Sequence, residues 1–340
     1  MRALGSASPL LVVGPSWVGD MVMAASLIEV LRMRDPGRPI DVLAPPAALP
    51  VARMIPGVRR TIPLGFAHGE LGLMARWRTG RALRAEGYGK AIILPRAFKA
   101  AIPPLAAGIP ERVGYKGELR SPLLTDARSD ANRKTARTIE RFVALGLPVG
   151  AMTSAPRPHL IMPDGALDQA LDRFSLPGSG PVMALCPGAE YGPAKRWPAE
   201  KFAKLAALAV KNGYRVRVFG SPKDAEAAKI IVEQSGVPVD NLVGRTSLID
   251  ASALLSIADV VISNDSGLMH IAGAFDRRLV VLYGASSELM TPPASPGARI
   301  VSRQLSCRPC HKRVCPLGTL ACLENISAEE VFEVAEQSGR

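Results

Sequence analysis

Short apolar runs alternate with helical patterns along almost the whole of this 340-residue chain, and this alternation constrains its fold more than any other feature. In the first half, apolar runs at 10–14, 40–45 and 91–95 are separated by helical patterns at 21–33 and 70–86. Such an order is typical of βαβ units, in which parallel strands form one sheet and helices cover its faces. The sequence therefore predicts an α/β fold with parallel sheets.

The alternation stops near the middle of the chain and then begins again. Residues 147–163 contain four prolines and no helical period, which is typical of a linker. Beyond it, we expect strands at 181–188, 215–220, 259–265 and 279–284, and helices at 198–213, 224–236 and 267–275. A chain of this length can form two domains with separate cores. We therefore expect domains over residues 1–155 and 156–340, with ligands bound at the carboxyl ends of the strands.

The excess positive charge is confined to the first half of the chain. The net charge is +12; residues 1–160 hold 23 Lys and Arg against 11 Asp and Glu, whereas residues 161–340 hold 19 of each. This asymmetry favours an anionic partner, namely nucleic acid, a membrane surface or a phosphorylated substrate, over a merely solvated surface. Nucleic acid is disfavoured because only 5% of residues are aromatic and no base-stacking motif is present. The polar, basic residues 115–135 are expected to form a long loop able to meet a ligand.

A cysteine cluster lies near the C-terminus. Its members are Cys307, Cys310, Cys315 and Cys322, whereas Cys186 stands alone and is expected to be buried. Four thiols at this spacing suit a structural zinc, two disulfides or, less well, an iron–sulfur cluster; unligated thiols are the alternative. The chain has no run of about 18 apolar residues and no signal peptide, so we expect a cytoplasmic protein. A reducing cytoplasm favours a bound metal or free thiols over disulfides, and a structural zinc is the hypothesis for this cluster.

The motif GPSWVGDMVMA (14–24) directly follows the first expected strand. Its glycines allow a tight turn, and Asp20 falls near the start of the next helix. A carboxylate there is either a helix N-cap or a general base that faces a ligand. The loop does not match GxGxxG, so it does not predict dinucleotide binding.

The motif CPGAEYGPAKRWP (186–198) follows the first strand of the second half. Its glycine-rich turn and the cations of Lys195 and Arg196 are suited to bind a phosphate. An ordinary loop with solvated basic residues is the alternative. The position directly after a strand favours phosphate binding.

The motif SNDSGLMHIAGA (263–274) combines a strand end with a helix start. The amides of Ser266 and Gly267 open the helix, whose dipole favours an anion. A lone histidine on a helix is usually structural, but His270 lies one turn from these amides and close to Asp265. We therefore expect this cluster to contact a ligand.

Together, these three motifs resemble those of the ADP-heptose:lipopolysaccharide heptosyltransferases of glycosyltransferase family 9. The similarity extends over nearly the whole chain and includes LPRAFKAA (94–101), AGIPERVGY (107–115), FGSPKD (219–224) and LYGASS (282–287). The resemblance implies a GT-B architecture of two Rossmann-like domains, in which the first domain binds the acceptor and the second binds the nucleotide sugar. It also implies an inverting reaction that requires no catalytic metal or other cofactor.

The resemblance assigns roles to individual residues. Asp20 matches the catalytic base of the family, and Lys195 matches its phosphate-binding lysine. The donor-binding positions implied in the same way are Gly188, Glu190, Tyr191, Asp224, Asp265, Ser266, Gly267 and His270.

The resemblance also implies the substrates. The donor is ADP-heptose, and the acceptor is heptosyl-Kdo2-lipid A, whose first heptose receives the new sugar. This anionic acceptor and the anionic inner leaflet of the inner membrane suit the basic first half. Candidate acceptor contacts are Arg59, Arg60, Arg96, Lys99, Lys116 and Arg120. The alternatives are a first heptosyl transfer to Kdo-lipid A and another GT-B nucleotide-sugar enzyme, such as an epimerase.

Overall fold

The structure of the protein is a computed structural model that describes residues 8–65, 71–131, 136–151, 154–293 and 295–337. It consists of two compact units, Met1–Ile161 and Met162–Arg340. None of the described helices is both long and apolar enough to cross a membrane.

The boundary between the units falls within the predicted linker, but after Ile161 rather than after residue 155. Two hydrogen bonds hold the intervening residues to the first unit. The Ser26 hydroxyl donates to the Pro156 carbonyl at 2.5 Å, and the Ile161 amide donates to the Met54 carbonyl at 2.8 Å. Residues 156–161 therefore belong to the first unit.

The first unit contains a six-stranded sheet in which every pairing is parallel. Its strand order is β3 (Val58–Pro63), β2 (Ile40–Ala44), β1 (Leu10–Val13), β4 (Lys90–Ile93), β5 (Glu111–Tyr115) and β6 (Asp126–Arg128). Strands β1, β2 and β4 confirm the three predicted apolar runs. All residues of β1 and β2 are buried, which is why nearly uninterrupted apolar runs mark these strands in the sequence.

The segment 115–135, for which a long loop was expected, contains a strand. β6 pairs with β5 at the edge of the sheet, so the loop prediction was wrong over Asp126–Arg128. An edge strand is only partly covered and needs no apolar run, so the sequence carries little signal for it. Residues 132–135 of the same segment lie outside the described residues.

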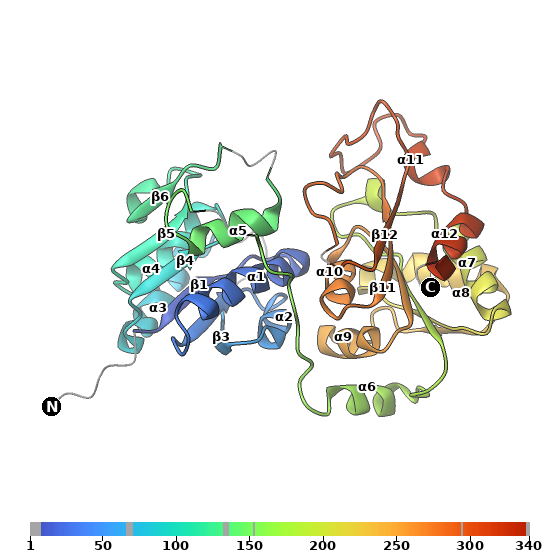
Figure 1. The fold of residues 1–340 in the computed structure, drawn as a ribbon, viewed down its shortest axis with the longest axis horizontal. Coiled ribbons are helices and arrows are strands. Elements are labelled where there is room, and N and C mark those ends of the chain that lie inside the picture. Colours follow the sequence, from blue (N-terminus) through green and yellow to red (C-terminus); the bar gives the residue numbers. More distant parts are fainter. Residues whose placement is uncertain (1–7, 66–70, 132–135, 152–153, 294, 338–340) are drawn as a thin grey trace. The chain divides into compact units, whose positions relative to one another are not determined.

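The helices of the first unit are α1 (Val18–Arg34), α2 (Leu49–Met54), α3 (Leu73–Ala82), α4 (Ile102–Ala106) and α5 (Thr138–Gly146). α1 begins before the predicted range 21–33. α3 confirms the helical pattern over 70–86 and continues into a 3₁₀ turn over Leu83–Glu86, while residue 70 lies outside the described residues. α1 and α5 pack side by side through a small apolar cluster of Val30, Val143 and Leu147 (Figure 1).

The second unit contains another six-stranded parallel sheet. Its order is β12 (Ala298–Ser302), β11 (Arg278–Tyr283), β10 (Val260–Asn264), β7 (Val182–Cys186), β8 (Arg215–Val218) and β9 (Val239–Asn241). Its helices are α6 (Ala166–Phe174), α7 (Ala199–Lys211), α8 (Ala225–Ser235), α9 (Leu248–Ser256), α10 (Gly267–Ala274), α11 (Ala321–Glu324) and α12 (Ala328–Gln337). The four predicted strands are β7, β8, β10 and β11, and the edge strands β9 and β12 were not predicted.

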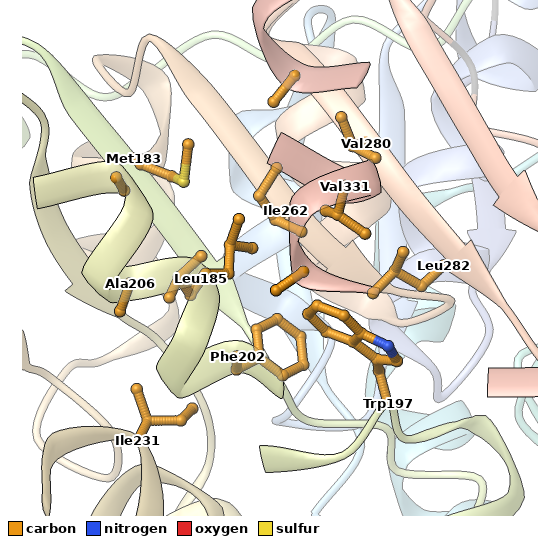
Figure 2. Packing of buried hydrophobic residues seen from close by; sticks show 14 of the residues in the cluster. Met183, Leu185, Trp197, Phe202, Ala206, Ile231, Ile262, Val280, Leu282 and Val331 are labelled. Atoms are coloured by element: carbon orange, nitrogen blue, oxygen red, sulfur yellow. The ribbon is translucent and has the colours of Figure 1, made fainter. Parts of the chain in front are cut away.

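Trp197 belongs to the apolar core of the second unit (Figure 2). The Trp197 indole meets the Phe202 ring edge-on, with 4.8 Å between ring centroids and 75° between their planes. Its Nε1 donates a hydrogen bond of 3.2 Å to the Ile326 carbonyl, so the polar atom of this buried side chain is satisfied. Leu185 of β7 and Ile262 of β10 belong to the same core. This packing fixes the loop that precedes α7.

Each sheet has a topological switch point. β1 pairs with β2 on one side and β4 on the other, and β7 lies between β8 and β10 in the same way. Chain connections diverge at the carboxyl ends of such strand pairs, and α/β proteins bind ligands in the crevice that results. The predicted architecture of two Rossmann-like units with parallel sheets is thus confirmed, and the switch point of each sheet is a candidate ligand site.

Candidate functional site

A cavity of about 380 Å³ occupies the switch point of the first sheet. Its lining includes Gly14 and Trp17, which follow β1, and Pro95, which follows β4. The cavity therefore lies where the fold predicts a ligand.

Asp20 lines this cavity from the first turn of α1. Trp17 occupies the N-cap position of α1, so the N-cap role considered for Asp20 does not apply. The positive end of the helix dipole stabilises a carboxylate in this turn. A half-buried carboxylate at the wall of a cavity can accept a proton from a bound ligand.

Four basic side chains line the same cavity: Arg76, Arg96, Lys99 and Arg141. The Arg141 guanidinium donates hydrogen bonds of 2.9 and 2.7 Å to the Asp130 carboxylate, and Arg96 lies 3.4 Å from the same group. Even with Asp20 and Asp130 counted, the cations outnumber the carboxylates. The cavity is thus suited to an anionic ligand. Sequence reasoning missed Arg76 and Arg141 because arginines within helical patterns are usually solvated.

Arg96 and Lys99 are the two candidate acceptor contacts that line the cavity. Arg59 and Arg60 lie on β3 and bind the buried Asp41 instead, at 2.6 Å and 2.9 Å respectively. Asp41 is near the amino end of β2, whereas the cavity is at the carboxyl ends of the strands. The structure therefore does not support an acceptor-binding role for these two arginines, whose contacts are with Asp41.

The Asp41 cluster is held by charge and hydrogen bonds. Burial raises the pKa of Asp41, but hydrogen bonds from Arg59 and Tyr88 outweigh burial and bring the pKa below its usual value. Burial and the 2.5 Å hydrogen bond that its hydroxyl donates to Asp41 raise the pKa of Tyr88 to about 12. These contacts stabilise the amino end of the sheet.

Arg120 is fully buried and makes main-chain contacts. It donates two hydrogen bonds to the Tyr115 carbonyl, at 2.9 and 2.7 Å, and a third to the Pro95 carbonyl. Burial lowers the pKa of Arg120 to about 10. Arg120 therefore positions the loop that lines the cavity rather than contacting an acceptor directly. Lys116 is exposed, and its carbonyl accepts hydrogen bonds from Arg96.

The switch point of the second sheet brings Lys195 and Asp265 together. The Lys195 ammonium lies 2.5 Å from the Asp265 carboxylate, which also accepts a 2.5 Å hydrogen bond from the Ser286 hydroxyl. Lys195 follows β7, Asp265 follows β10 and Ser286 follows β11. Three strand ends thus converge on one carboxylate.

The N-terminus of α10 lies beside this ion pair. Ser266 is its N-cap, but the Ser266 side chain makes no capping hydrogen bond, and Gly267 is the first helical residue. The first amides of a helix and the positive end of its dipole form an anion-binding site. The structure therefore brings together the residues that the sequence grouped here.

His270 is buried one turn into α10. Burial lowers its pKa to about 4, although the negative charge of Asp265 opposes the shift. Within the described part of the chain, its Nδ1 has no hydrogen-bond partner. The imidazole is therefore neutral at pH 7 and has a nitrogen available for a ligand.

Sequence reasoning missed Asn264 and Trp197, which hold the two loops together. The Asn264 side chain donates a hydrogen bond of 2.6 Å to the Pro187 carbonyl and accepts one of 3.1 Å from the Trp197 amide. The two loops are far apart in the sequence, so only the fold reveals their bridge.

Asp224 lies under the loop that follows β7. Its carboxylate accepts hydrogen bonds from the Ser221 amide and hydroxyl, at 2.9 and 2.8 Å, and lies 3.5 Å from Arg196. A Cβ atom at position 188 would lie 2.6 Å from this carboxylate, so the close approach of Asp224 to this loop requires glycine at that position. Glu190 is exposed and forms an ion pair with Lys223. The contacts described for Asp224 and Glu190 are thus with the protein itself.

The cysteine cluster does not form a metal site in the described structure. No group of three or more His, Cys, Asp or Glu among the described residues is placed to hold a metal ion. The thiols differ in their surroundings, since Cys307 is exposed and Cys322 is buried. The hypothesis of a structural zinc is therefore not supported. Cys186 is buried, as expected.

Comparisons with known proteins agree on one family. The sequence model of glycosyltransferase family 9 (heptosyltransferase) matches residues 76–321 of this chain. Lipopolysaccharide heptosyltransferase 2 of Escherichia coli strain K12 is 41% identical over 303 residues, which cover 86% of this chain and 87% of that protein.

Solved structures show the same fold. The structure of the ADP-heptose lipopolysaccharide heptosyltransferase II of E. coli matches with a TM-score of 0.86 and 37% identity, and covers 97% of this chain and 98% of that one. A family 9 glycosyltransferase of Veillonella parvula DSM 2008 matches with a TM-score of 0.85 and 24% identity over 98% of this chain and 97% of that one, a likeness of fold.

Proposed function

This chain belongs to glycosyltransferase family 9, the heptosyltransferases of lipopolysaccharide inner-core synthesis, and we propose that it catalyses the second heptosyl transfer. The donor is ADP-heptose, and the acceptor hydroxyl belongs to the first heptose of heptosyl-Kdo2-lipid A. The names of the similar proteins support this step in particular.

One observation in the first unit carries the acceptor side of the proposal. Asp20 faces a cavity that four basic side chains surround, at the switch point of the sheet. The cations bind the phosphates and carboxylates of the acceptor, and Asp20 takes the proton from its attacking hydroxyl. The first unit is thus the acceptor-binding domain.

The second unit binds the donor. The diphosphate of ADP-heptose accepts hydrogen bonds from the Lys195 ammonium and from the amides at the start of α10. As the acceptor oxygen forms its bond to the anomeric carbon, the bond to the diphosphate oxygen breaks and ADP leaves with the electron pair. Attack from the face opposite to ADP inverts the anomeric configuration. Lys195 and the α10 amides stabilise the charge that develops on ADP, so no metal ion is needed.

The remaining donor positions complete this site. The neutral His270 offers its Nδ1 to the donor, and Tyr191, Glu190 and Gly188 line the approach to the diphosphate. Asp224 positions this loop, and its contact with the ribose remains part of the proposal. The reaction uses no cofactor.

We further propose that the protein is cytoplasmic and attaches peripherally to the anionic inner leaflet. The support lies at the start of α3, where Leu73, Met74 and Trp77 of the helix are exposed, as is Leu71 just before it. The exposed Arg78 and Arg81 follow on the same helix. Apolar and aromatic side chains beside arginines suit the interface of an anionic membrane. We call Leu71, Leu73, Met74 and Trp77 the α3 apolar patch.

The test measures ADP release from ADP-heptose with Kdo2-lipid A acceptors that carry no heptose or one heptose. We expect turnover only with the one-heptose acceptor. Asp20→Asn should lower kcat by about a hundredfold or more, because general-base catalysis contributes on that order. Its KM for ADP-heptose should not change, because Asp20 belongs to the acceptor cavity.

Each rival function gives a different result. Turnover with the acceptor that lacks heptose would assign the protein to the first transfer. Binding of UDP rather than ADP in a thermal-shift assay would favour another nucleotide-sugar enzyme, such as an epimerase. Saturable micromolar DNA binding would revive the nucleic-acid alternative.

A further inference from the structure

The cysteine-containing segment Cys307–Cys322 is attached to the loops of the donor site. The His311 amide donates a hydrogen bond of 2.8 Å to the Ala285 carbonyl, and the Ala194 amide donates one of 3.0 Å to the Arg313 carbonyl. The Tyr191 hydroxyl donates a hydrogen bond of 2.8 Å to the His311 carbonyl. The segment is thus hydrogen-bonded both to the loop that carries Lys195 and to the loop that follows β11.

A buried arginine reinforces this attachment. Arg308 donates hydrogen bonds to the carbonyls of Gly284 and Ser286, at 2.6 and 3.2 Å, and to the Glu288 carboxylate at 2.9 Å. The side chain of Arg308 is only 6% exposed. The Ser286 hydroxyl in turn binds Asp265, so the segment is connected to the Lys195–Asp265 pair.

The approach of the segment to the donor loop leaves no room for a side chain. A Cβ on Gly192 would lie 2.5 Å from the Arg313 carbonyl oxygen and 3.1 Å from its Cα. The obstacle is backbone, which cannot move aside as a flexible side chain can. Gly192 is therefore required for residue 313 to lie against this loop.

Arg313 and Lys195 share one aromatic ring. The Arg313 guanidinium carbon lies 5.3 Å from the centroid of the Tyr191 ring, and the Lys195 Nζ lies 5.1 Å from it. Both distances are within the range of cation–π contacts. The ring thus holds two cations at the site where the diphosphate is proposed to bind.

The two cations differ in how their charge is compensated. The Lys195 ammonium is 2.5 Å from Asp265, so the pair has no net charge. No acidic side chain of the described residues forms an ion pair with Arg313, whose guanidinium lies over the Tyr191 ring. Binding of a dianion or trianion at this point requires positive charge beyond that of a neutral pair. The guanidinium of Arg313, on the same Tyr191 ring as Lys195, is placed to add such charge.

We propose that Arg313 is a second diphosphate-binding residue of the donor site, delivered by the cysteine-containing segment. Its guanidinium donates hydrogen bonds to the phosphate oxygens of ADP-heptose and of the departing ADP. A planar guanidinium can contact two phosphate oxygens at once, which an ammonium cannot. The inference rests on the proposed use of ADP-heptose as the donor.

The test is calorimetric binding of ADP and of adenosine to the full-length protein. In Arg313→Gln, we expect ADP to bind about tenfold more weakly, the loss typical of a charged hydrogen bond, with adenosine affinity unchanged. Arg313→Lys should restore part of the affinity, because charge returns without the planar geometry. Lys312→Gln is the matched control, since it removes the neighbouring exposed cation, and it should bind ADP like the wild type.

Several results would overturn the inference. Wild-type ADP affinity in Arg313→Gln would exclude the contact. An equal loss for ADP and adenosine, together with a lower Tm, would indicate that Arg313 only supports the loop. An equal loss in Lys312→Gln would indicate a diffuse effect of charge. Failure of the wild-type protein to bind ADP at all would instead reject the proposed donor, and the inference with it.

Discussion

The Lys195 ammonium lies 2.5 Å from the Asp265 carboxylate, although the two residues follow different strands, β7 and β10. These strands are parallel neighbours, so their carboxyl ends bring the two loops together. Both side chains are largely buried, and each compensates the charge of the other. The pair holds the ammonium next to the start of α10, where a phosphate can meet both.

Replacement of Asp265 by alanine should strongly destabilise the second unit. The change leaves the Lys195 ammonium buried without its partner, which typically costs about 3–5 kcal/mol. The measurement is urea unfolding of the full-length variant. Glu190→Gln is the control, because it breaks the exposed ion pair with Lys223 and should cost less than about 1 kcal/mol. An equal loss of unfolding free energy in the two variants would show that the buried Lys195–Asp265 pair contributes no more to stability than the exposed pair.

Lys99 and Arg59 should respond differently when each is replaced by glutamine. Lys99 lines the cavity in which we propose that the acceptor binds, so Lys99→Gln should raise the KM for the acceptor by about tenfold, the effect of one charged hydrogen bond. Arg59 binds Asp41 at the other end of the sheet, so Arg59→Gln should lower Tm and leave this KM unchanged. Steady-state kinetics at saturating donor distinguish the two. A raised acceptor KM in Arg59→Gln would contradict the assignment.

Most interior strands could be predicted from the sequence, whereas the edge strands could not. The interior strand β5 was missed as well, because it begins with the charged residues Glu111 and Arg112 and has no uninterrupted apolar run. β1 and β7 are buried along their whole length, so their sequences are nearly all apolar. β3 has no fully buried residue and contains two arginines, and β6 has three partly covered residues. Their place in the sheet comes from backbone pairing with a neighbour, which leaves little trace in side-chain hydropathy.

The sequence singled out the loops that follow β7 and β10 because glycine and charged residues gather after these two strands. Lys195 and Asp265 lie in these loops, and the structure places them in contact. The contacts of Arg59 and Arg60 with Asp41 could not be predicted, because net charge does not reveal which end of a sheet a residue occupies. Arg313 could not be predicted at all, since its contact with Tyr191 depends on the path of the intervening chain.

The stability of the second unit should fall as the pH is lowered from 6.5 towards 4. Burial lowers the pKa of His270 to about 4, whereas the unfolded chain has the ordinary value of 6.5. Between these values the unfolded state binds a proton that the folded state does not, so stability increases with pH across this window. At pH 5 the loss is on the order of 2 kcal/mol relative to pH 7.5.

Urea unfolding of the wild type and of His270→Asn at both pH values isolates this contribution. The variant should lose less stability between pH 7.5 and pH 5 than the wild type, because the group that titrates in the unfolded state is gone. An identical loss in both proteins would assign the pH dependence to other groups.

The α3 apolar patch should determine binding to anionic membranes. Met74 is 66% exposed and Trp77 is 40% exposed, so the double substitution Met74→Ser/Trp77→Ser removes apolar surface without opening a cavity. We expect vesicles of phosphatidylglycerol and phosphatidylethanolamine to bind this variant at least tenfold more weakly, since burial of two such side chains contributes more than about 1.4 kcal/mol. Turnover with a deacylated, soluble acceptor should not change.

The control for the α3 patch is Met33→Ser on α1. Met33 is 69% exposed and lies between Arg32 and Arg34, so it matches Met74 in chemistry and exposure but not in location. Vesicle flotation should give wild-type binding for this control, and binding of the wild type should weaken as salt increases. Equal losses in the two variants would mean that exposed methionines beside arginines bind vesicles wherever they lie, and that α3 is not a specific membrane contact.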